Sequence, residues 1–208
     1  MSNESHLIKL GEKIKSKEAI ICIIGLGRVG LPLASILANK NYNVLGIDVD
    51  EKKIEKIRNS ICPFYDPPLQ KNLEEAVNKG KLIVSAHISK NKSDVIILTV
   101  GTPSLEGSAD YSQLYSAINE ICITDIFGKL IILRSTLPPK TTEDIIIPML
   151  EKKTNLKCGK DFALAVCPER ILEGKAIQEI NDLPEIIGGV NKISSEIAKE
   201  VFLAINNK

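Results

Sequence analysis

The sequence predicts an α/β fold in which helices cover both faces of a doubly wound, mostly parallel sheet. Short runs rich in Ile and Val recur along the chain with little polar alternation, as expected for strands that are buried on both faces. Stretches with helical periodicity separate these runs, and such alternation builds right-handed crossover units. The first apolar run leads directly into a glycine-rich turn and a further helical stretch.

The elements follow along the chain in a simple order. Residues 1–18 carry Leu7, Leu10 and Ile14 at helical spacing and predict a short amphipathic helix, while residues 19–208 form a single α/β domain. Strands are predicted at 19–24, 44–48, 82–85, 95–100, 130–133, 162–167 and 186–188. Helices are predicted at 30–40, 51–59, 69–79, 111–122, 141–152 and 192–206.

Composition excludes several classes of protein. The 208 residues are 44% hydrophobic and 25% charged, as in an ordinary globular protein, and the net charge of +1 argues against a nucleic-acid binder. The chain has no apolar run of about 20 residues and no apolar signal core at its start, so we expect a cytoplasmic protein. Five cysteines without a C-x-x-C pair, with only His6 and His87 as histidines, predict neither disulfides nor a metal site.

The most informative segment, residues 20–34, reads IICIIGLGRVGLPLA. In such a strand–turn–helix, Gly25 allows the tight turn, Gly27 lets the backbone approach a pyrophosphate, and Gly30 lets the helix pack close to the strand. The exposed N–H groups at the start of the helix then bind the anion. This pattern predicts a Rossmann-type dinucleotide site. The competing interpretation is a tight turn without a ligand.

The next strand ends in Asp48, 18 residues after Gly30. A carboxylate there accepts hydrogen bonds from the adenosine ribose and repels a 2′-phosphate, so NAD is favoured over NADP. Lys52 and Lys53 weaken that preference slightly. Asp48 could also serve only as a helix cap.

Two later strand ends place hydroxyl groups at the edge where ligands of such sheets bind. Thr102 follows one strand, and Ser135 with Thr136 follows another. Both threonines could equally be helix caps or turn formers. The strand after these ends in Glu169, which could be a general base or could simply pair with Arg170.

Together these segments resemble the N-terminal NAD-binding domain of the UDP-glucose/GDP-mannose 6-dehydrogenase family. The matching stretches are 24–34 (IGLGRVGLPLA), 46–50 (GIDVD), 100–103 (VGTP), 135–139 (STLPP) and 167–176 (CPERILEGKA). The Pro-Glu-Arg form of the last stretch is similar to members that act on UDP-N-acetyl-hexosamines, such as UDP-N-acetyl-mannosamine dehydrogenase. Lys140 departs from the pattern, because many members have glycine there.

The resemblance implies oxidation of the C6 alcohol of a UDP-sugar, UDP-N-acetyl-mannosamine or UDP-glucose, to the uronate. Two hydrides pass to NAD, with a thiohemiacetal and a thioester on a cysteine as intermediates. Thr136 would hold the catalytic water and Glu169 would assist its attack, with a pKa raised toward neutrality by burial. Thr102 and Ser135 would lie along the nicotinamide half. The expected cofactor contacts are Gly25, Gly27, Arg28, Val29, Gly30, Asp48, Lys53, Val100, Thr102, Ser135, Thr136 and Glu169.

The resemblance also implies parts that this sequence lacks. Family members carry the reactive cysteine in a second, UDP-sugar-binding domain, after a central helix that also serves a homodimer interface. We therefore expect a piece of a longer enzyme that binds NAD but does not turn over. Two alternatives stay open: a non-catalytic NAD-binding or sensing module, and another β-hydroxyacid-type dehydrogenase.

Overall fold

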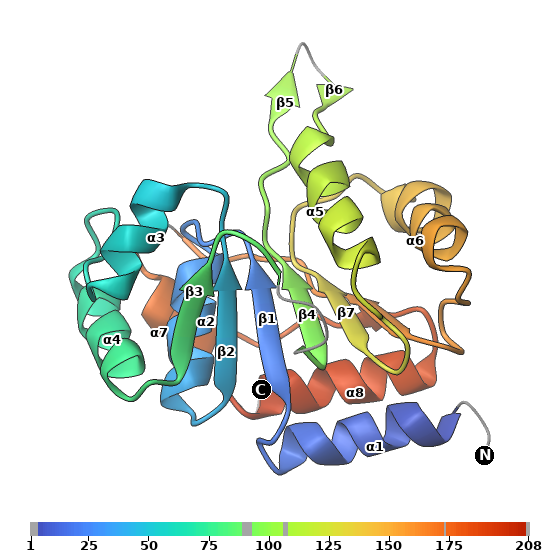
Figure 1. Ribbon diagram of the computed structural model, residues 1–208, viewed down its shortest axis with the longest axis horizontal. Coiled ribbons are helices and arrows are strands. Elements are labelled where there is room, and N and C mark those ends of the chain that lie inside the picture. Colours follow the sequence, from blue (N-terminus) through green and yellow to red (C-terminus); the bar gives the residue numbers. More distant parts are fainter. Residues whose placement is uncertain (1–3, 89–92, 106–107, 173, 207–208) are drawn as a thin grey trace.

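The computed structural model describes residues 4–88, 93–105, 108–172 and 174–206. Its centre is a seven-stranded sheet in the order β3-β2-β1-β4-β7-β8-β9, with helices on both faces (Figure 1). Neighbouring strands are parallel, except that β9 runs antiparallel to β8. The strands are β1 (Ile20–Ile24), β2 (Asn43–Ile47), β3 (Leu82–Ser85), β4 (Val95–Leu98), β7 (Leu130–Leu133), β8 (Ala163–Val166) and β9 (Gly188–Gly189). The predicted fold class is confirmed.

The helices are α1 (Glu4–Lys15), α2 (Gly30–Asn39), α3 (Glu51–Arg58), α4 (Pro67–Asn78), α5 (Ser112–Cys122), α6 (Ile147–Thr154), α7 (Ala176–Asp182) and α8 (Lys192–Leu203). Helices α2 to α7 lie in the connections between strands, whereas α1 precedes β1 and α8 follows β9. A π-helical turn, η1 (Thr142–Ile146), leads into α6. The short hairpin of β5 (Ser104–Leu105) and β6 (Ser108–Ala109) projects away from the sheet above β4 (Figure 1).

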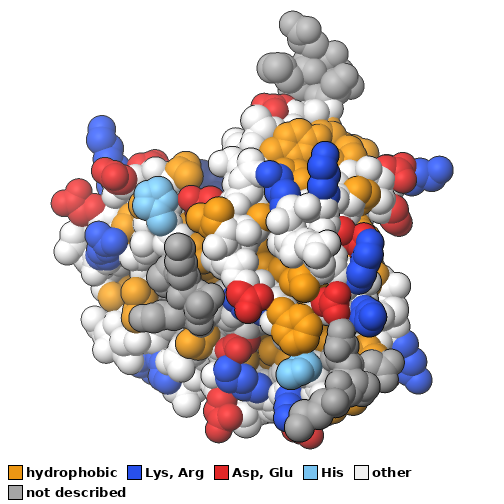
Figure 2. Space-filling model, turned by 45° about the vertical axis from the view of Figure 1, so that its right-hand side comes forward, with side chains coloured by type: hydrophobic (Ala, Val, Ile, Leu, Met, Phe, Trp, Pro, Cys, Tyr) orange, Lys and Arg blue, Asp and Glu red, His pale blue; other side chains and the backbone are white. Residues whose placement is uncertain are grey.

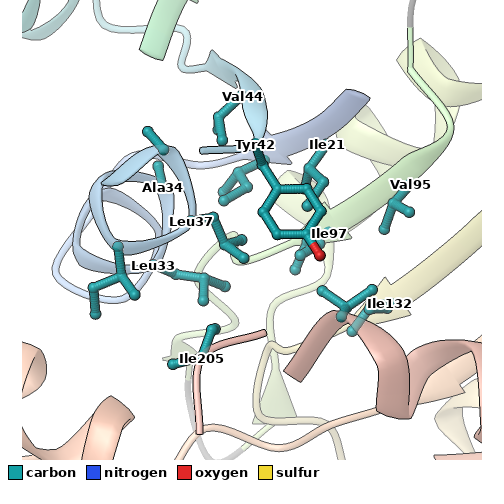
Figure 3. Packing of buried hydrophobic residues seen from close by; sticks show 14 of the residues in the cluster. Ile21, Leu33, Ala34, Leu37, Tyr42, Val44, Val95, Ile97, Ile132 and Ile205 are labelled. Carbon is teal, nitrogen blue, oxygen red and sulfur yellow. The ribbon is translucent and has the colours of Figure 1, made fainter. Parts of the chain in front are cut away.

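The Ile- and Val-rich strands are buried because their successive side chains enter two separate cores. In β1, Ile21 and Ile23 belong to one apolar cluster, whereas Cys22 and Ile24 belong to the other. The ring of Tyr42, which is only 1% exposed, packs among the aliphatic side chains of the first cluster (Figure 3). A sheet covered on both faces therefore needs continuous apolar strands, as the sequence has them.

Helix α1 lies beside α8 under the sheet (Figure 1). Its side chains at helical spacing, Leu7, Leu10 and Ile14, are all buried, so the predicted amphipathic face is real. The hydroxyl of Tyr42 donates a hydrogen bond of 2.8 Å to the carbonyl oxygen of Ile14 and ties the end of this helix to the main core. Residues 1–3 of the predicted segment lie outside the described residues.

The structure corrects four details of the predicted elements. Helix α4 begins at Pro67 rather than at residue 69, because the carboxylate of Asp66 caps the helix at the N–H of Leu69 and proline is tolerated in the first turn. Helix α7 and the β5–β6 hairpin were not predicted. The predicted strand at 95–100 ends at Leu98, because the following residues turn over the glycine-rich loop.

The surface agrees with the charge balance of the sequence. On the face shown in Figure 2, acidic and basic side chains are interspersed rather than separated by sign. Among the described residues, no helix is long and apolar enough to span a membrane.

The order of strands reverses between β1 and β4, and in such sheets the crevice at the carboxyl ends of the two strands is the place for a ligand.

Candidate cofactor and active site

The turn after β1 is built around its three glycines. Gly25 has a φ of +96°, which a side chain would strain, and a Cβ on Gly30 would lie 1.9 Å from the carbonyl oxygen of Gly25. A Cβ on Gly27, by contrast, would meet no atom within 4 Å, so its backbone faces open space. The hydroxyl of Thr99 locks the turn by donating to the carbonyl oxygens of Gly25 (2.6 Å) and Ile24 (3.0 Å).

Helix α2 starts directly behind this turn. No side chain caps its first turn; the N–H of Leu31 donates to the carbonyl oxygen of Gly27 (3.1 Å) and Pro32 has none, so the backbone that faces open space at this positive end is that of Gly27. Every residue from Gly30 to Ala38 is buried, which fixes the helix against the sheet. The turn and the helix therefore form a rigid cradle for an anionic group.

A first cavity of about 460 Å³ opens beside this cradle, between the ends of β1 and β2 and the flank of α5. Its floor is apolar and its rim carries carboxylates and a lysine. The lining residues are Ile24, Gly25, Gly27, Ile47, Asp48, Val49, Asp50, Lys53, Thr99, Val100, Gly101, Gln113, Ser116, Ala117 and Glu120.

Asp48 is the best-anchored polar residue of this cavity and is 7% exposed. Its Oδ2 accepts from the N–H of Leu26 (2.8 Å) and from Nζ of Lys53 (2.6 Å), while its Oδ1 accepts from the N–H of Asp50 (3.0 Å). Asp48 does not cap α3, because that role belongs to Asp50, whose carboxylate accepts from the N–H of Lys53. The carboxylate thus fixes the glycine turn and holds Lys53 at the cavity rim.

A second cavity of about 510 Å³ continues on the other side of β4 and shares Thr99, Val100, Gly101 and Gln113 with the first. Its other lining residues are Val29, Thr102, Pro103, Arg134, Ser135, Thr136 and Glu169. Two cross-links hold its walls together. The hydroxyl of Ser135 donates to the carbonyl oxygen of Val100, and that of Thr102 donates to the carbonyl oxygen of Thr136, both at 2.6 Å.

The carboxylate of Glu169 has a partner that the sequence did not suggest. Its Oε2 lies 2.6 Å from both Nε and Nη2 of Arg134, a residue at the end of β7 that is 2% exposed. The alternative of an ion pair with the side chain of Arg170 is wrong, because that guanidinium donates to the carbonyl oxygen of Pro184. Only the backbone N–H of Arg170 contacts Glu169, at 2.7 Å.

Arg28 and Gly30, two of the expected cofactor contacts, line neither cavity. The guanidinium of Arg28 stacks over the ring of Phe64 at 4.8 Å, and Gly30 is buried beneath the turn. Lys140 has a φ of +69°, the backbone region that favours glycine. Glu173 lies outside the described residues.

None of the five cysteines has the environment of a reactive thiol. Burial raises the pKa of Cys22, Cys158 and Cys167 to about 12, and it also raises the pKa of Cys62 and Cys122. Within the described part of the chain, no group of three His, Cys, Asp or Glu side chains could hold a metal ion.

Several lining residues were missed by the sequence prediction. Thr99 lies at a strand end that the sequence analysis identified. Its spacing in the sequence does not reveal that its hydroxyl bonds the glycine turn. Gln113, Ser116 and Glu120 lie on one flank of α5 and contribute to the first cavity, Gln113 to both. The sequence signal that could have identified these residues is their position on an amphipathic helix that starts soon after the VGTP stretch.

Comparison with known proteins gives a consistent result. The family model described as "UDP-glucose/GDP-mannose dehydrogenase family, NAD binding domain" matches residues 19–206. A UDP-N-acetyl-D-mannosamine dehydrogenase of Methanococcus vannielii is 40% identical over 92% of this chain and 43% of its own length. A GDP-mannose 6-dehydrogenase of Pseudomonas savastanoi is 33% identical over 88% of this chain and 43% of its own.

Solved structures agree. The UDP-N-acetyl-mannosamine dehydrogenase of Staphylococcus aureus superposes with a TM-score of 0.86 at 35% identity, over 91% of this chain and 46% of that chain. A 3-hydroxyisobutyrate dehydrogenase of Salmonella typhimurium, at 13% identity and a TM-score of 0.60, shares the fold alone. The chain spans 43% to 46% of the length of the three nucleotide-sugar dehydrogenases named above.

Proposed function

The chain belongs to the UDP-glucose/GDP-mannose dehydrogenase family, and from this premise we propose that it is the NAD-binding part of a nucleotide-sugar 6-dehydrogenase. The complete enzyme would oxidise the C6 alcohol of a UDP-sugar to the uronate. One observation carries the proposal: two cavities meet at Thr99–Gly101 beside a glycine turn whose Gly27 faces open space. The identity to a UDP-N-acetyl-D-mannosamine dehydrogenase, 40%, exceeds that to a GDP-mannose 6-dehydrogenase, 33%, and favours UDP-N-acetyl-mannosamine as the sugar nucleotide.

The residues of the first cavity fit the adenosine and diphosphate parts of NAD. The open backbone at Gly27, at the positive end of α2, suits a diphosphate, because no side chain stands in the way. Asp48 and Lys53 suit the ribose hydroxyls, one as acceptor and the other as donor. The Asp48 carboxylate would also oppose a 2′-phosphate.

The residues of the second cavity suit the reacting end. NAD bound across both cavities would supply the hydride acceptor. Thr102 and Ser135 hold the walls of this cavity together through their carbonyl contacts, which keeps its shape fixed for the reacting groups. Thr136 is exposed to the cavity and is our candidate for the residue that holds the hydrolytic water, and Glu169 is our candidate for the group that assists its attack.

We propose that the thiol that forms the thioester lies outside these 208 residues. The raised pKa of each cysteine here leaves little thiolate near neutral pH, and the thiolate is the nucleophile. We therefore propose that the chain alone binds NAD and does not turn over.

The test compares this chain with the complete polypeptide. Both are mixed with NAD and either UDP-N-acetyl-mannosamine or UDP-glucose, and NADH is followed by absorbance. We expect two NADH per sugar from the complete polypeptide, and NAD binding without NADH from the 208-residue chain. A complete polypeptide that binds NAD but oxidises neither sugar would point to a sensing module, and NADH from the chain alone would refute the assignment of the thiol.

A further inference from the structure

A buried ion cluster stands directly behind the second cavity. Arg134, at the end of β7, is 2% exposed and contacts two carboxylates: Glu169 at 2.6 Å and Glu185 at 2.8 Å. The carboxylate side chains are 10% and 12% exposed. The guanidinium also lies over the ring of Phe202 from α8, 5.1 Å from the ring centre. Glu169 therefore meets a cation that is fixed from three sides.

Glu169 accepts three hydrogen bonds and makes one further ion-pair contact. Its Oε2 accepts from Nε of Arg134 (2.6 Å) and also lies 2.6 Å from Nη2 of the same residue, while its Oε1 accepts from the backbone N–H groups of Arg170 (2.7 Å) and Ile171 (2.9 Å). Both oxygens of this carboxylate are therefore held, one by the guanidinium and the other by the loop backbone.

The second carboxylate, Glu185, divides the charge of Arg134. Burial opposes the charge of Arg134, but Glu185 and Glu169 outweigh it and raise the pKa of the guanidinium. Burial raises the pKa of Glu185 as well, against the opposing pull of Arg134. The guanidinium of Arg134 thus forms ion pairs with both carboxylates, and each carboxylate weakens the attraction between the guanidinium and the other one.

The charged and titratable groups around the cluster come from three further segments. The guanidinium of Arg170 binds the carbonyl oxygen of Pro184, next to Glu185. From α7, the carboxylate of Glu179 accepts the N–H of Leu172. The thiol of Cys167 has a pKa of about 12 and stays neutral. Within the described residues, Arg134 is therefore the ion-pair partner of Glu169, and Glu185 shares that arginine.

We propose that Arg134 and Glu185 are positioning residues for Glu169: the guanidinium fixes its carboxylate at the wall of the second cavity, and Glu185 takes up part of the positive charge of that guanidinium. This rests on the function proposed above. Neither residue touches substrate in this scheme, and both act only through Glu169.

The proposal predicts pH shifts of opposite sign. Removing the charge of Glu185 leaves the whole cation to Glu169, which favours the ionised carboxylate. Removing the charge of Arg134 leaves two carboxylates side by side, which favours a protonated one. The acid limb of the kcat–pH profile should move by about one pH unit to lower pH in Glu185→Gln and to higher pH in Arg134→Gln.

The experiment uses the complete polypeptide with NAD and the sugar that the unmodified enzyme oxidises. Glu185→Gln is nearly isosteric and is expected to fold, and Arg134→Lys keeps the charge and should restore part of the activity lost in Arg134→Gln. We expect kcat to fall at least about tenfold in Arg134→Gln with little change in KM. Glu75→Gln, which breaks the exposed pair with Lys79 on α4, is the control and should leave the profile unchanged.

The outcomes separate the two proposals. An unmodified polypeptide that makes no NADH overturns the proposed function. An active enzyme whose acid limb stays in place in Glu185→Gln overturns the positioning role, because a purely structural pair would lower activity or stability without moving the limb. If Arg134→Gln fails to fold, the position of the acid limb of the kcat–pH profile in Glu185→Gln alone tests the positioning role.

Discussion

Two substitutions in the glycine turn should have opposite consequences although the chemical change is the same. In Gly30→Ala, the new methyl group would lie 1.9 Å from the carbonyl oxygen of Gly25 and 2.5 Å from the hydroxyl of Thr99. The backbone has to move, at a cost near the upper end of about 1–3 kcal/mol for overpacking. Alanine regains about 1 kcal/mol as a better helix former than glycine. We expect a net loss of about 2 kcal/mol in the free energy of unfolding.

In Gly27→Ala, the methyl group would meet no atom within 4 Å, so stability should stay within about 0.5 kcal/mol of the unmodified chain. The same methyl group would stand where we place the diphosphate, and the affinity for NAD should fall at least about tenfold, or about 1.4 kcal/mol. Urea unfolding and calorimetric titration with NAD measure both effects. Unchanged NAD affinity in Gly27→Ala, or unchanged stability in Gly30→Ala, would refute this account of the turn.

Three further predictions concern selectivity, thiol reactivity and the first helix. Asp48→Asn removes the charge that opposes a 2′-phosphate and should reduce the preference for NAD over NADP about tenfold in paired titrations, whereas an unchanged ratio would exclude Asp48 as the selecting group. At pH 8, a thiol with a pKa of about 12 has a thiolate fraction of about 10⁻⁴. Alkylation of Cys22 and Cys167 should therefore proceed about 10³-fold more slowly in the native chain than in urea. Mass spectrometry that finds both thiols labelled equally fast in the two states would contradict their burial. Tyr42→Phe leaves the carbonyl oxygen of Ile14 without its partner and should cost about 1 kcal/mol in urea unfolding, with no loss expected if the helix were not held by this bond.

Most of the sheet could be predicted because its signal is local. Each parallel strand is a short apolar run, and the pattern needs no knowledge of its neighbours; β3 and β7 were predicted with the bounds that the structure has. Helix α7 was missed because it has only seven residues and its N-cap residue, Lys175, makes no capping bond. The π-helical η1 lies within a stretch predicted as helix, since its apolar spacing differs little from that of an α-helix over one turn.

The residues of the site also differ in whether their signal is local in the sequence. The glycine turn and Asp48 are close in sequence and follow a known spacing, so their shared cavity could be expected. The ion cluster around Arg134 could not be expected, because Glu169 and Glu185 lie 35 and 51 residues further along the chain. Only the pairing of β7 with β8 brings Glu169 close to Arg134. Ion pairs formed by the fold leave no periodic trace in a sequence.

The account depends most on the claim that backbone amides of the glycine turn bind a diphosphate. A crystal structure of the 208-residue chain grown with saturating NAD tests this most directly. We predict the diphosphate at the start of α2, against Gly27, with the adenosine ribose beside Asp48 and Lys53. NAD bound elsewhere on the molecule, or a turn that stays without ligand at saturation, would contradict the claim.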